Sequence, residues 1–205
     1  MAKLDFKNRR IQQVLCAIRK DYRNFLMEFS TIYEGREKSI SQLFNATFSS
    51  SEGPEEGAVI GELVERIIAE TSPEDIYAVT AWDKGDLIGG IFFTRLQYSN
   101  DARNVFLMAP VAVATARQGQ RVGSKLIKHG LDILRADGVD IAVTYGDPAY
   151  YGRLGFAHVS VNQVPSPMPL QMPQGWLAQG LSGGSFAPLQ GKSTCVQAFD
   201  NPALW

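Results

Sequence analysis

A glycine-containing turn, Gln118-Gly119-Gln120-Arg121-Val122-Gly123, joins an apolar run typical of a strand to an amphipathic run typical of a helix. The first turn of a helix presents unpaired N–H groups and the positive end of the helix dipole, and a glycine there lets a phosphate approach the backbone. Arg121 and Lys125 add two positive charges that the dipole disfavours and that a bound polyanion would stabilise. The turn therefore predicts a phosphate or pyrophosphate site.

Two other interpretations of the same turn remain open. One is an ordinary glycine bend followed by a solvated basic helix face. The more distant one is a nucleotide-binding switch protein. The turn has neither the Gly-Lys-Ser/Thr of a Walker A loop nor the Gly-x-Gly-x-x-Gly of a dinucleotide-binding fold. All three interpretations predict a strand-to-helix junction and differ in whether an anion binds, and which one.

Pro110 lies in the middle of the apolar run just before this turn, in the sequence LMAPVAV. Proline has no N–H group to donate to a strand ladder, so inside a central strand it indicates a bulge or an edge. A bulge here would separate the strand from its neighbour and expose backbone groups along it. The resulting slot would suit an extended, amide-bearing ligand.

A second constellation follows the next predicted strand, in the sequence GDPAYYGRLGF over residues 146–156. Asp147-Pro148 is a turn-initiating pair, and Tyr151 stands four residues before Gly155-Phe156. Tyr150 and Tyr151 are candidates for proton transfer by a phenol, and the alternative is that both are aromatic core residues.

The two segments, in this order, resemble the GCN5-related N-acetyltransferase (GNAT) family, and the resemblance extends from about Phe25 to about residue 200. In that family the splayed strand binds the pantetheine arm of acetyl-CoA, and the helix start binds the pyrophosphate with the pattern R/Q-x-x-G-x-G/A. Gln118 and Gly123 match the first and last positions of this pattern, whereas Arg121 stands where the middle glycine is usual. The second segment is similar to a bacterial subgroup of predicted acetyltransferases. The acetyl-CoA-binding residues that the resemblance implies are Val111, Ala112, Val113, Gln118, Gly119, Gln120, Arg121, Val122, Gly123 and Ser124, with no metal.

Acetyl transfer to an amine expels a thiolate whose conjugate acid has a pKa of about 8.5. A positioned phenol can donate a proton to that sulfur, and Tyr151 is the predicted catalytic acid, with Tyr150 as its stand-in. The N–H group of Val113 is a candidate to polarise the thioester carbonyl. The general base is left open. It is either a water relay or a side chain, and the candidate side chains are Glu34, Glu52, Glu55 and Glu56, with His158 as a weaker candidate.

The elements that must position these residues alternate between strand and helix patterns. We expect strands over residues 25–33, 76–82, 87–99, 104–114, 139–146 and 192–199, and helices over 36–48, 58–70 and 119–136. An acidic loop is expected over 49–57. The fold class predicted from this order and from the resemblance is a mixed α/β domain of the GNAT acyl-CoA N-acyltransferase fold. Its central sheet is mostly antiparallel, with a splayed parallel strand pair and flanking helices.

Composition sets the remaining expectations. The chain has 205 residues, and seven Lys/Arg stand against two Asp/Glu in residues 1–25. We expect a basic N-terminal extension over 1–24 and an N-acetyltransferase domain over 25–205. Two distant cysteines and no apolar run of roughly 18 residues favour a cytoplasmic protein. The net charge of −1 gives no reason to expect a nucleic acid or membrane partner, and a homodimer is kept open.

The predicted function is an acetyl-CoA-dependent N-acetyltransferase that transfers acetyl directly to a primary amine of a small molecule or protein. The alternative is a catalytically inactive, CoA-binding regulatory module. The acidic residues Glu52–Glu56 suggest a cationic acceptor such as a polyamine, an aminoglycoside or lysine. A solvated acidic loop is the competing interpretation.

Overall fold

The computed structural model describes residues 27–205. The predicted extension over residues 1–24 lies outside the described residues, so the two-part division of the chain stays a prediction. None of the helices described over 27–205 is long and apolar enough to cross a membrane.

The main elements alternate as the sequence patterns predict. The strands are β1 (Glu28–Ser30), β2 (Ile76–Asp83), β3 (Asp86–Tyr98), β4 (Asp101–Val113), β5 (Ile141–Tyr145), β6 (Ala157–His158), β7 (Trp176–Gly180) and β8 (Ser193–Thr194). The α-helices are α2 (Glu37–Glu52), α3 (Pro54–Glu70), α4 (Val122–Ala136) and α5 (Pro148–Tyr151). Short 3₁₀ turns lie between or after these elements. Those that adjoin the site are η2 (Thr115–Arg117), η3 (Gly152–Leu154), η5 (Gln197–Phe199) and η6 (Pro202–Leu204).

One sheet runs through the domain in the order β1-β2-β3-β4-β5-β7-β6, with β8 added to β3. All its pairings are antiparallel except that of β4 with β5, which α4 connects. Parallel neighbours need such a crossover connection, because a hairpin can join only antiparallel strands. The predicted mixed α/β fold with one parallel strand pair is confirmed.

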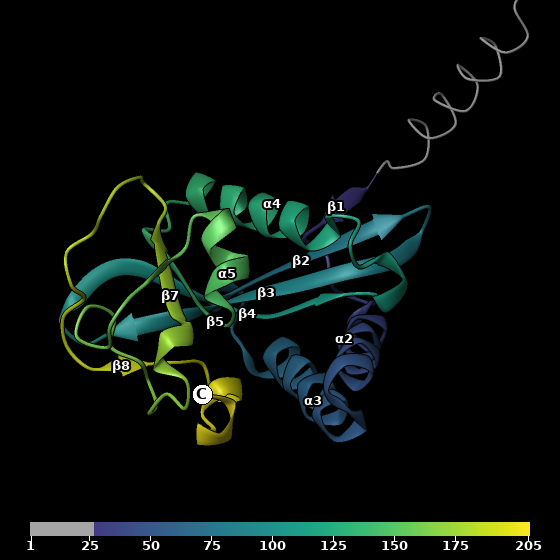
Figure 1. Ribbon diagram of the computed structural model, residues 1–205, viewed down its shortest axis with the longest axis horizontal. Helices are drawn as coiled ribbons and strands as arrows, with labels where there is room; N and C mark the ends of the chain where they lie inside the picture. The colour runs from purple at the N-terminus through teal and green to yellow at the C-terminus, as the bar shows by residue number, and fades with distance from the viewer. Residues whose placement is uncertain (1–26) are drawn as a thin grey trace, which may run out of the picture.

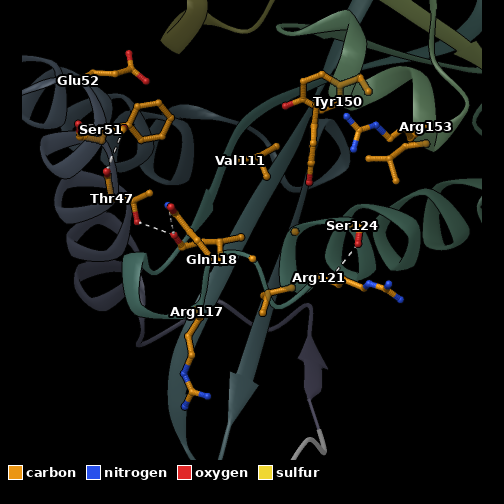
Figure 2. Close-up of a pocket in the computed structure, with 17 residues that line it drawn as sticks. Thr47, Ser51, Glu52, Val111, Arg117, Gln118, Arg121, Ser124, Tyr150 and Arg153 are labelled. Atoms are coloured by element: carbon orange, nitrogen blue, oxygen red, sulfur yellow. Dashed lines mark hydrogen bonds between the residues drawn. The ribbon is translucent and has the colours of Figure 1, made fainter.

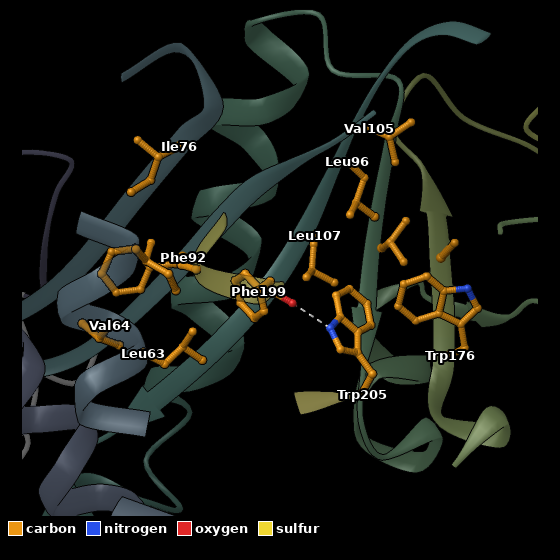
Figure 3. Close-up of a cluster of buried hydrophobic side chains, with 14 of the residues drawn as sticks. Leu63, Val64, Ile76, Phe92, Leu96, Val105, Leu107, Trp176, Phe199 and Trp205 are labelled. Carbon is orange, nitrogen blue, oxygen red and sulfur yellow. Dashed lines mark hydrogen bonds between the residues drawn. The ribbon is translucent and has the colours of Figure 1, made fainter. Parts of the chain in front are cut away.

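Helices cover both faces of the sheet, α2 and α3 on one side and α4 with α5 on the other (Figure 1). Each side has its own apolar core. Phe44, Val64 and Phe92 belong to the first, which also takes in Trp176 and Trp205 of the C-terminal part (Figure 3). Leu126 and Phe93 belong to the second. The site described below lies where the two helical layers approach the same end of β4.

The prediction of a loop over residues 49–57 is wrong. Helix α2 continues to Glu52 and α3 begins at Pro54, so Gly53 alone separates them. Gly53 takes a φ of +106°, which only glycine adopts without strain, and proline is favoured as the first residue of a helix. The helices then pack closely, because a Cβ at Gly57 would lie 2.6 Å from the Asn45 carbonyl oxygen. Glu52 and Glu56 are thereby held on a rigid corner.

The C-terminal part also differs from the prediction. The closing strand expected over 192–199 shrinks to β8, and residues 197–199 form η5. Strand β7, which starts at Trp176, was not predicted as a strand. It pairs with β5 from Tyr145↔Trp176 to Ile141↔Gly180. Its apolar stretch is short and is surrounded by Pro, Gly and Gln, so its pairing comes from tertiary contacts.

Strands β4 and β5 part midway, and we name this point the fork. Their parallel ladder runs from Val105↔Ile141 to Met108↔Thr144, whereas β4 continues to Val113 along β3. The register of β3 against β4 shifts at the same place, so that Ala109 and Pro110 bulge opposite Phe92. The bulge predicted from Pro110 is therefore confirmed, and it opens the edge of β4 that faces β5.

Replacing Gly130 by alanine is expected to lower the free energy of unfolding by about 1–3 kcal/mol, although alanine is the better helix former. A Cβ atom at Gly130 would lie 2.6 Å from Cε2 of Phe93, a ring that is fully buried in β3. Chemical denaturation measures the difference. Gly152→Ala is the matched control, because nothing lies within 4 Å of its Cβ position, and it should keep full stability. An unchanged unfolding midpoint for Gly130→Ala would contradict close packing of α4 on the sheet.

Candidate active site

A cavity of about 740 Å³ lies beside the open edge of β4. Its walls come from the end of α2, from β4, from the turn before α4 and from α5 with η3. Figure 2 shows Thr47, Ser51 and Glu52 on one side, with Tyr150 and Arg153 on the other. We name this cavity the strand pocket.

The turn that opens α4 differs from the prediction in one respect. The helix starts at Val122, three residues later than expected, because Gly119 and Arg121 both take left-handed backbone angles, with φ of +74° and +63°. Arg121 is thus the residue before the helix and not part of its first turn. No side chain caps this end of α4, so the first-turn N–H groups remain available to a ligand.

Hydrogen bonds fix this turn to β4 and α2. The Gln118 side-chain amide donates to the Val113 carbonyl oxygen at 3.3 Å, and the Thr47 hydroxyl donates to the same oxygen at 3.5 Å (Figure 2). The backbone N–H of Ala114 donates to the Ile88 carbonyl at 3.0 Å. Because backbone groups alternate along an antiparallel strand, the N–H of Val113 then points to the opposite, open edge.

Arg117, in η2, stabilises the turn before α4 through an ion pair. Its guanidinium lies 2.8 Å from the carboxylate of Asp83, whose side chain is only 5% exposed at the end of β2. Figure 2 shows the Arg117 side chain directed away from Val111. The pair therefore ties η2 to the β2–β3 hairpin, and Arg117 is engaged by a protein carboxylate.

Most of the predicted acetyl-CoA residues line the strand pocket, namely Val111, Val113, Gln118, Gly119, Arg121, Val122, Gly123 and Ser124. Two do not. The side chain of Ala112 is buried in the core on the α2 side, as strand alternation requires. Gln120 turns back and donates to the Ala116 carbonyl at 3.2 Å.

Sequence reasoning missed the contribution of α2 and η3. Thr47, Phe48 and Ser51 come from α2, and Arg153 and Leu154 come from η3. No sequence signal marked the α2 residues, because only tertiary packing brings this helix to β4. Arg153 carried a signal, since it follows Tyr151 within the second constellation.

Tyr150 and Tyr151 both line the strand pocket but occupy different environments. A Cβ atom at Gly123 would lie 2.8 Å from the Tyr150 hydroxyl, which places this hydroxyl at the start of α4. Tyr151 is more deeply buried and interacts with Thr144, whose own hydroxyl donates to the Met108 carbonyl at 2.9 Å. Burial raises the pKa of Tyr151 to about 12, against the opposing effect of Thr144. Tyr151 therefore stays protonated beside the fork.

A second cavity of about 830 Å³ adjoins the first on the other side of the fork. Both cavities are lined by Phe48, Glu52, Val111, Tyr150 and Tyr151. We name the second one the C-terminal pocket, because residues 171–172, 199 and 203–205 complete its wall.

Only some of the candidates for a general base line a pocket at the fork. Glu52 lines both cavities and Glu56 lines the C-terminal pocket. Glu34 and Glu55 line neither, and His158 lies on β6 beside a different surface pocket. His129 stacks on Phe29 with ring centroids 4.4 Å apart, at β1.

The chain belongs to a known family. Residues 28–159 match the acetyltransferase (GNAT) domain family. The protein is therefore a GNAT acetyltransferase, as the resemblance of the two motifs predicted.

Individual relatives agree with this assignment. The chain is 28% identical over 148 residues to the uncharacterized N-acetyltransferase YjhQ of Escherichia coli K12, covering 70% of this chain and 81% of that protein. A GNAT family acetyltransferase from Brucella melitensis, in complex with acetyl-CoA, is 26% identical with a TM-score of 0.62. The match covers 85% of this chain and 98% of that one. YhbS from Escherichia coli, in complex with CoA, shares the fold at 21% identity and a TM-score of 0.64. The match covers 87% of this chain and 93% of that one.

A double-mutant cycle on Asp83→Asn and Arg117→Gln is expected to give a coupling energy of at least about 1 kcal/mol, because the Asp83 carboxylate is almost fully buried. Unfolding of the two single variants and the double variant measures it. The Arg66–Glu70 pair on α3 is the matched control, at 3.0 Å with both side chains about one third exposed. Its coupling energy should be about 0.3–0.5 kcal/mol. Equal coupling in the two pairs would contradict a supporting role for Arg117.

Proposed function

We propose that the protein transfers the acetyl group of acetyl-CoA directly to a primary amine. The observation that carries this proposal is the meeting of two cavities at the fork, with Tyr151 in the wall of both. Such an arrangement lets a thioester approach from the strand pocket and an acceptor from the C-terminal pocket. A reaction between two bound substrates needs this convergence.

The residues of the strand pocket suit acetyl-CoA. The uncapped start of α4 offers N–H groups to a pyrophosphate, and Gly123 leaves the backbone accessible where a Cβ would meet Tyr150. The cationic side chains of Arg121 and Arg153 line the same cavity. The open edge of β4 offers backbone groups at Val111 and Val113 to the amide groups of a pantetheine arm.

Acetyl-CoA supplies an acetyl thioester, and the acceptor amine forms a C–N bond to the acetyl carbon as the C–S bond breaks. The N–H groups on the open edge of β4 can donate to the carbonyl oxygen as its charge grows. Glu52, Glu56 or a water molecule beside them can take the proton that the amine loses. Among the described residues, Cys195 is the single cysteine, and it lines neither pocket. This supports direct transfer without an acetyl-cysteine.

Tyr151 is proposed to stabilise the departing thiolate. Burial raises the pKa of Tyr151 to about 12, above that of an ordinary thiol at about 8.5, so complete transfer of its proton to sulfur is disfavoured. A hydrogen bond from the phenol to the thiolate carries no such cost. Tyr151 therefore acts chiefly as a hydrogen-bond donor, and the proton reaches sulfur later from solvent.

Tyr151→Phe is expected to lower kcat at least about tenfold with little change in CoA affinity, because the variant loses a hydrogen bond that forms as the thiolate leaves. Steady-state thiol release and calorimetric CoA titration give the two quantities. Tyr33→Phe is the control, since Tyr33 lines neither pocket. A full kcat in Tyr151→Phe together with a loss in Tyr150→Phe would reverse the assignment of the two tyrosines. An inactive CoA-binding module would bind CoA and release no thiol with any amine.

Gly123→Asp is expected to weaken CoA binding at least tenfold, about 1.4 kcal/mol, while the protein stays folded. A carboxylate at a helix start favours the empty helix and repels a pyrophosphate. The new Cβ would lie 2.8 Å from the Tyr150 hydroxyl, the end of a side chain that can move, and 3.4 Å from Cγ2 of Val113, an ordinary contact distance. Gly152→Asp adds the same charge into open space outside both pockets and should bind CoA normally. Unchanged CoA affinity in folded Gly123→Asp would contradict the proposed pyrophosphate site.

A further inference from the structure

The C-terminal pocket has an apolar floor. Ile60 and Leu63 come from α3, Leu107 from β4, and Phe199 and Trp205 from the C-terminal segment. All five side chains are at least nine-tenths buried within the protein, and Figure 3 shows Leu63, Leu107, Phe199 and Trp205 in one cluster. A floor of this composition offers no hydrogen-bond partner to a polar ligand group, apart from backbone.

The charged groups of this pocket are all acidic. Glu52, Glu56 and Asp147 line it, and no Lys, Arg or His does so among the described residues. The Asp147 carboxylate already accepts a hydrogen bond from the Ala149 N–H at 2.8 Å, as the cap of α5. Glu52 and Glu56, on either side of Gly53, remain as the pair that can attract a cation near the fork.

The wall that faces the acceptor is fixed in place. The indole N–H of Trp205 donates to the Phe199 carbonyl at 3.0 Å, and the Met172 N–H donates to the Tyr145 hydroxyl at 2.6 Å. Arg66 on α3 donates to the Gln197 carbonyl at 3.2 Å. This wall lies beyond residues 28–159, which match the family domain. The pocket that receives the acceptor is thus completed by a part of the chain outside the family match.

We propose that the acceptor is a small primary monoamine with an apolar body of aromatic size, and this inference rests on the proposed transfer to an amine. The ammonium group lies near Glu52 and Glu56 and the apolar body rests on the floor. A volume of about 830 Å³ falls in the range of small-molecule sites. After the amine loses its proton, its nitrogen is directed to the fork.

The apolar floor disfavours the polycations that the acidic residues alone suggested. A polyamine or aminoglycoside would bring further ammonium groups or hydroxyls against Leu63, Leu107 and Phe199. Each charged or polar group buried there without a partner costs free energy, whereas an apolar body gains it from burial. The apolar floor therefore selects against an acceptor with a second ammonium group, while Glu52 and Glu56 attract the single ammonium group of a monoamine.

The test compares acceptors that each carry at least one primary amine and differ in the rest of the molecule. Thiol release from acetyl-CoA is measured with 2-phenylethylamine, ethanolamine, spermidine and a lysine-containing peptide. We expect kcat/KM for 2-phenylethylamine to exceed each of the others at least tenfold, about 1.4 kcal/mol. A higher value for spermidine or for the peptide, or equal values for 2-phenylethylamine and ethanolamine, would overturn the inference and leave the proposed transfer intact.

A matched pair of variants tests the floor directly. Leu204, half-buried at the C-terminal pocket, is changed to aspartate, which should shift the ratio of kcat/KM from 2-phenylethylamine toward spermidine at least tenfold. Val161→Asp is the control, because Val161 is 47% exposed and lies outside this pocket, and the ratio should not change. Calorimetric CoA titration confirms that both variants are folded. An unchanged ratio in folded Leu204→Asp would overturn the inference.

A second matched pair tests the acidic residues. Glu56→Gln is expected to raise KM for 2-phenylethylamine at least threefold, and Glu55→Gln, one residue away and outside the pocket, should not. Equal KM changes in the two variants would overturn the role of the acidic pair. Calorimetric binding of 2-phenylethylamine to the CoA-saturated protein separates the two proposals. Binding without thiol release would support the apolar monoamine pocket and overturn the proposed transfer.

Discussion

The parting of β4 from β5 after Met108 and Thr144 is the constraint on which the rest of the site depends. A parallel ladder that continued would pair every backbone group on this edge of β4 and leave no room for a ligand. Pro110 lacks an N–H group, and the bulge at Ala109–Pro110 lets β4 run on beside β3 alone. Both cavities, the position of Tyr151 and the exposed N–H groups follow from this one separation.

The sequence was informative where the chemistry of a single residue decides the backbone. Pro110 predicted the bulge, and the glycine turn before α4 predicted a strand-to-helix junction with an uncapped helix start. Tyr151 was identified by its spacing from Gly155-Phe156, and it does line the two pockets. These signals are local, so they could be read without knowing which elements pack together.

The failures share a different cause, since each concerns residues placed by long-range packing. The α2–α3 corner was taken for a loop because its Ser, Gly and Glu residues are typical of loops, yet Gly57 packs it tightly against Asn45. Strand β7 exists because β5 offers it an edge. For the same reason the full lining of the C-terminal pocket could not be predicted from the sequence. The acidic residues were visible in the sequence, but the apolar floor beneath them is assembled from α3, β4 and the C-terminal segment.

Arg121 affects the turn before α4 through both its backbone conformation and its charge. A non-glycine residue in the left-handed region costs about 1–2 kcal/mol, and Arg121 adopts it with a φ of +63° where glycine is usual in the family. Its positive charge also stands against the positive end of α4, which no side chain caps. Both costs are present without a ligand. A glycine would remove the first but would also remove the guanidinium. At the proposed pyrophosphate site a bound anion would turn the second cost into an attraction, so under that proposal Arg121 lowers the stability of the fold and raises the affinity for the anion.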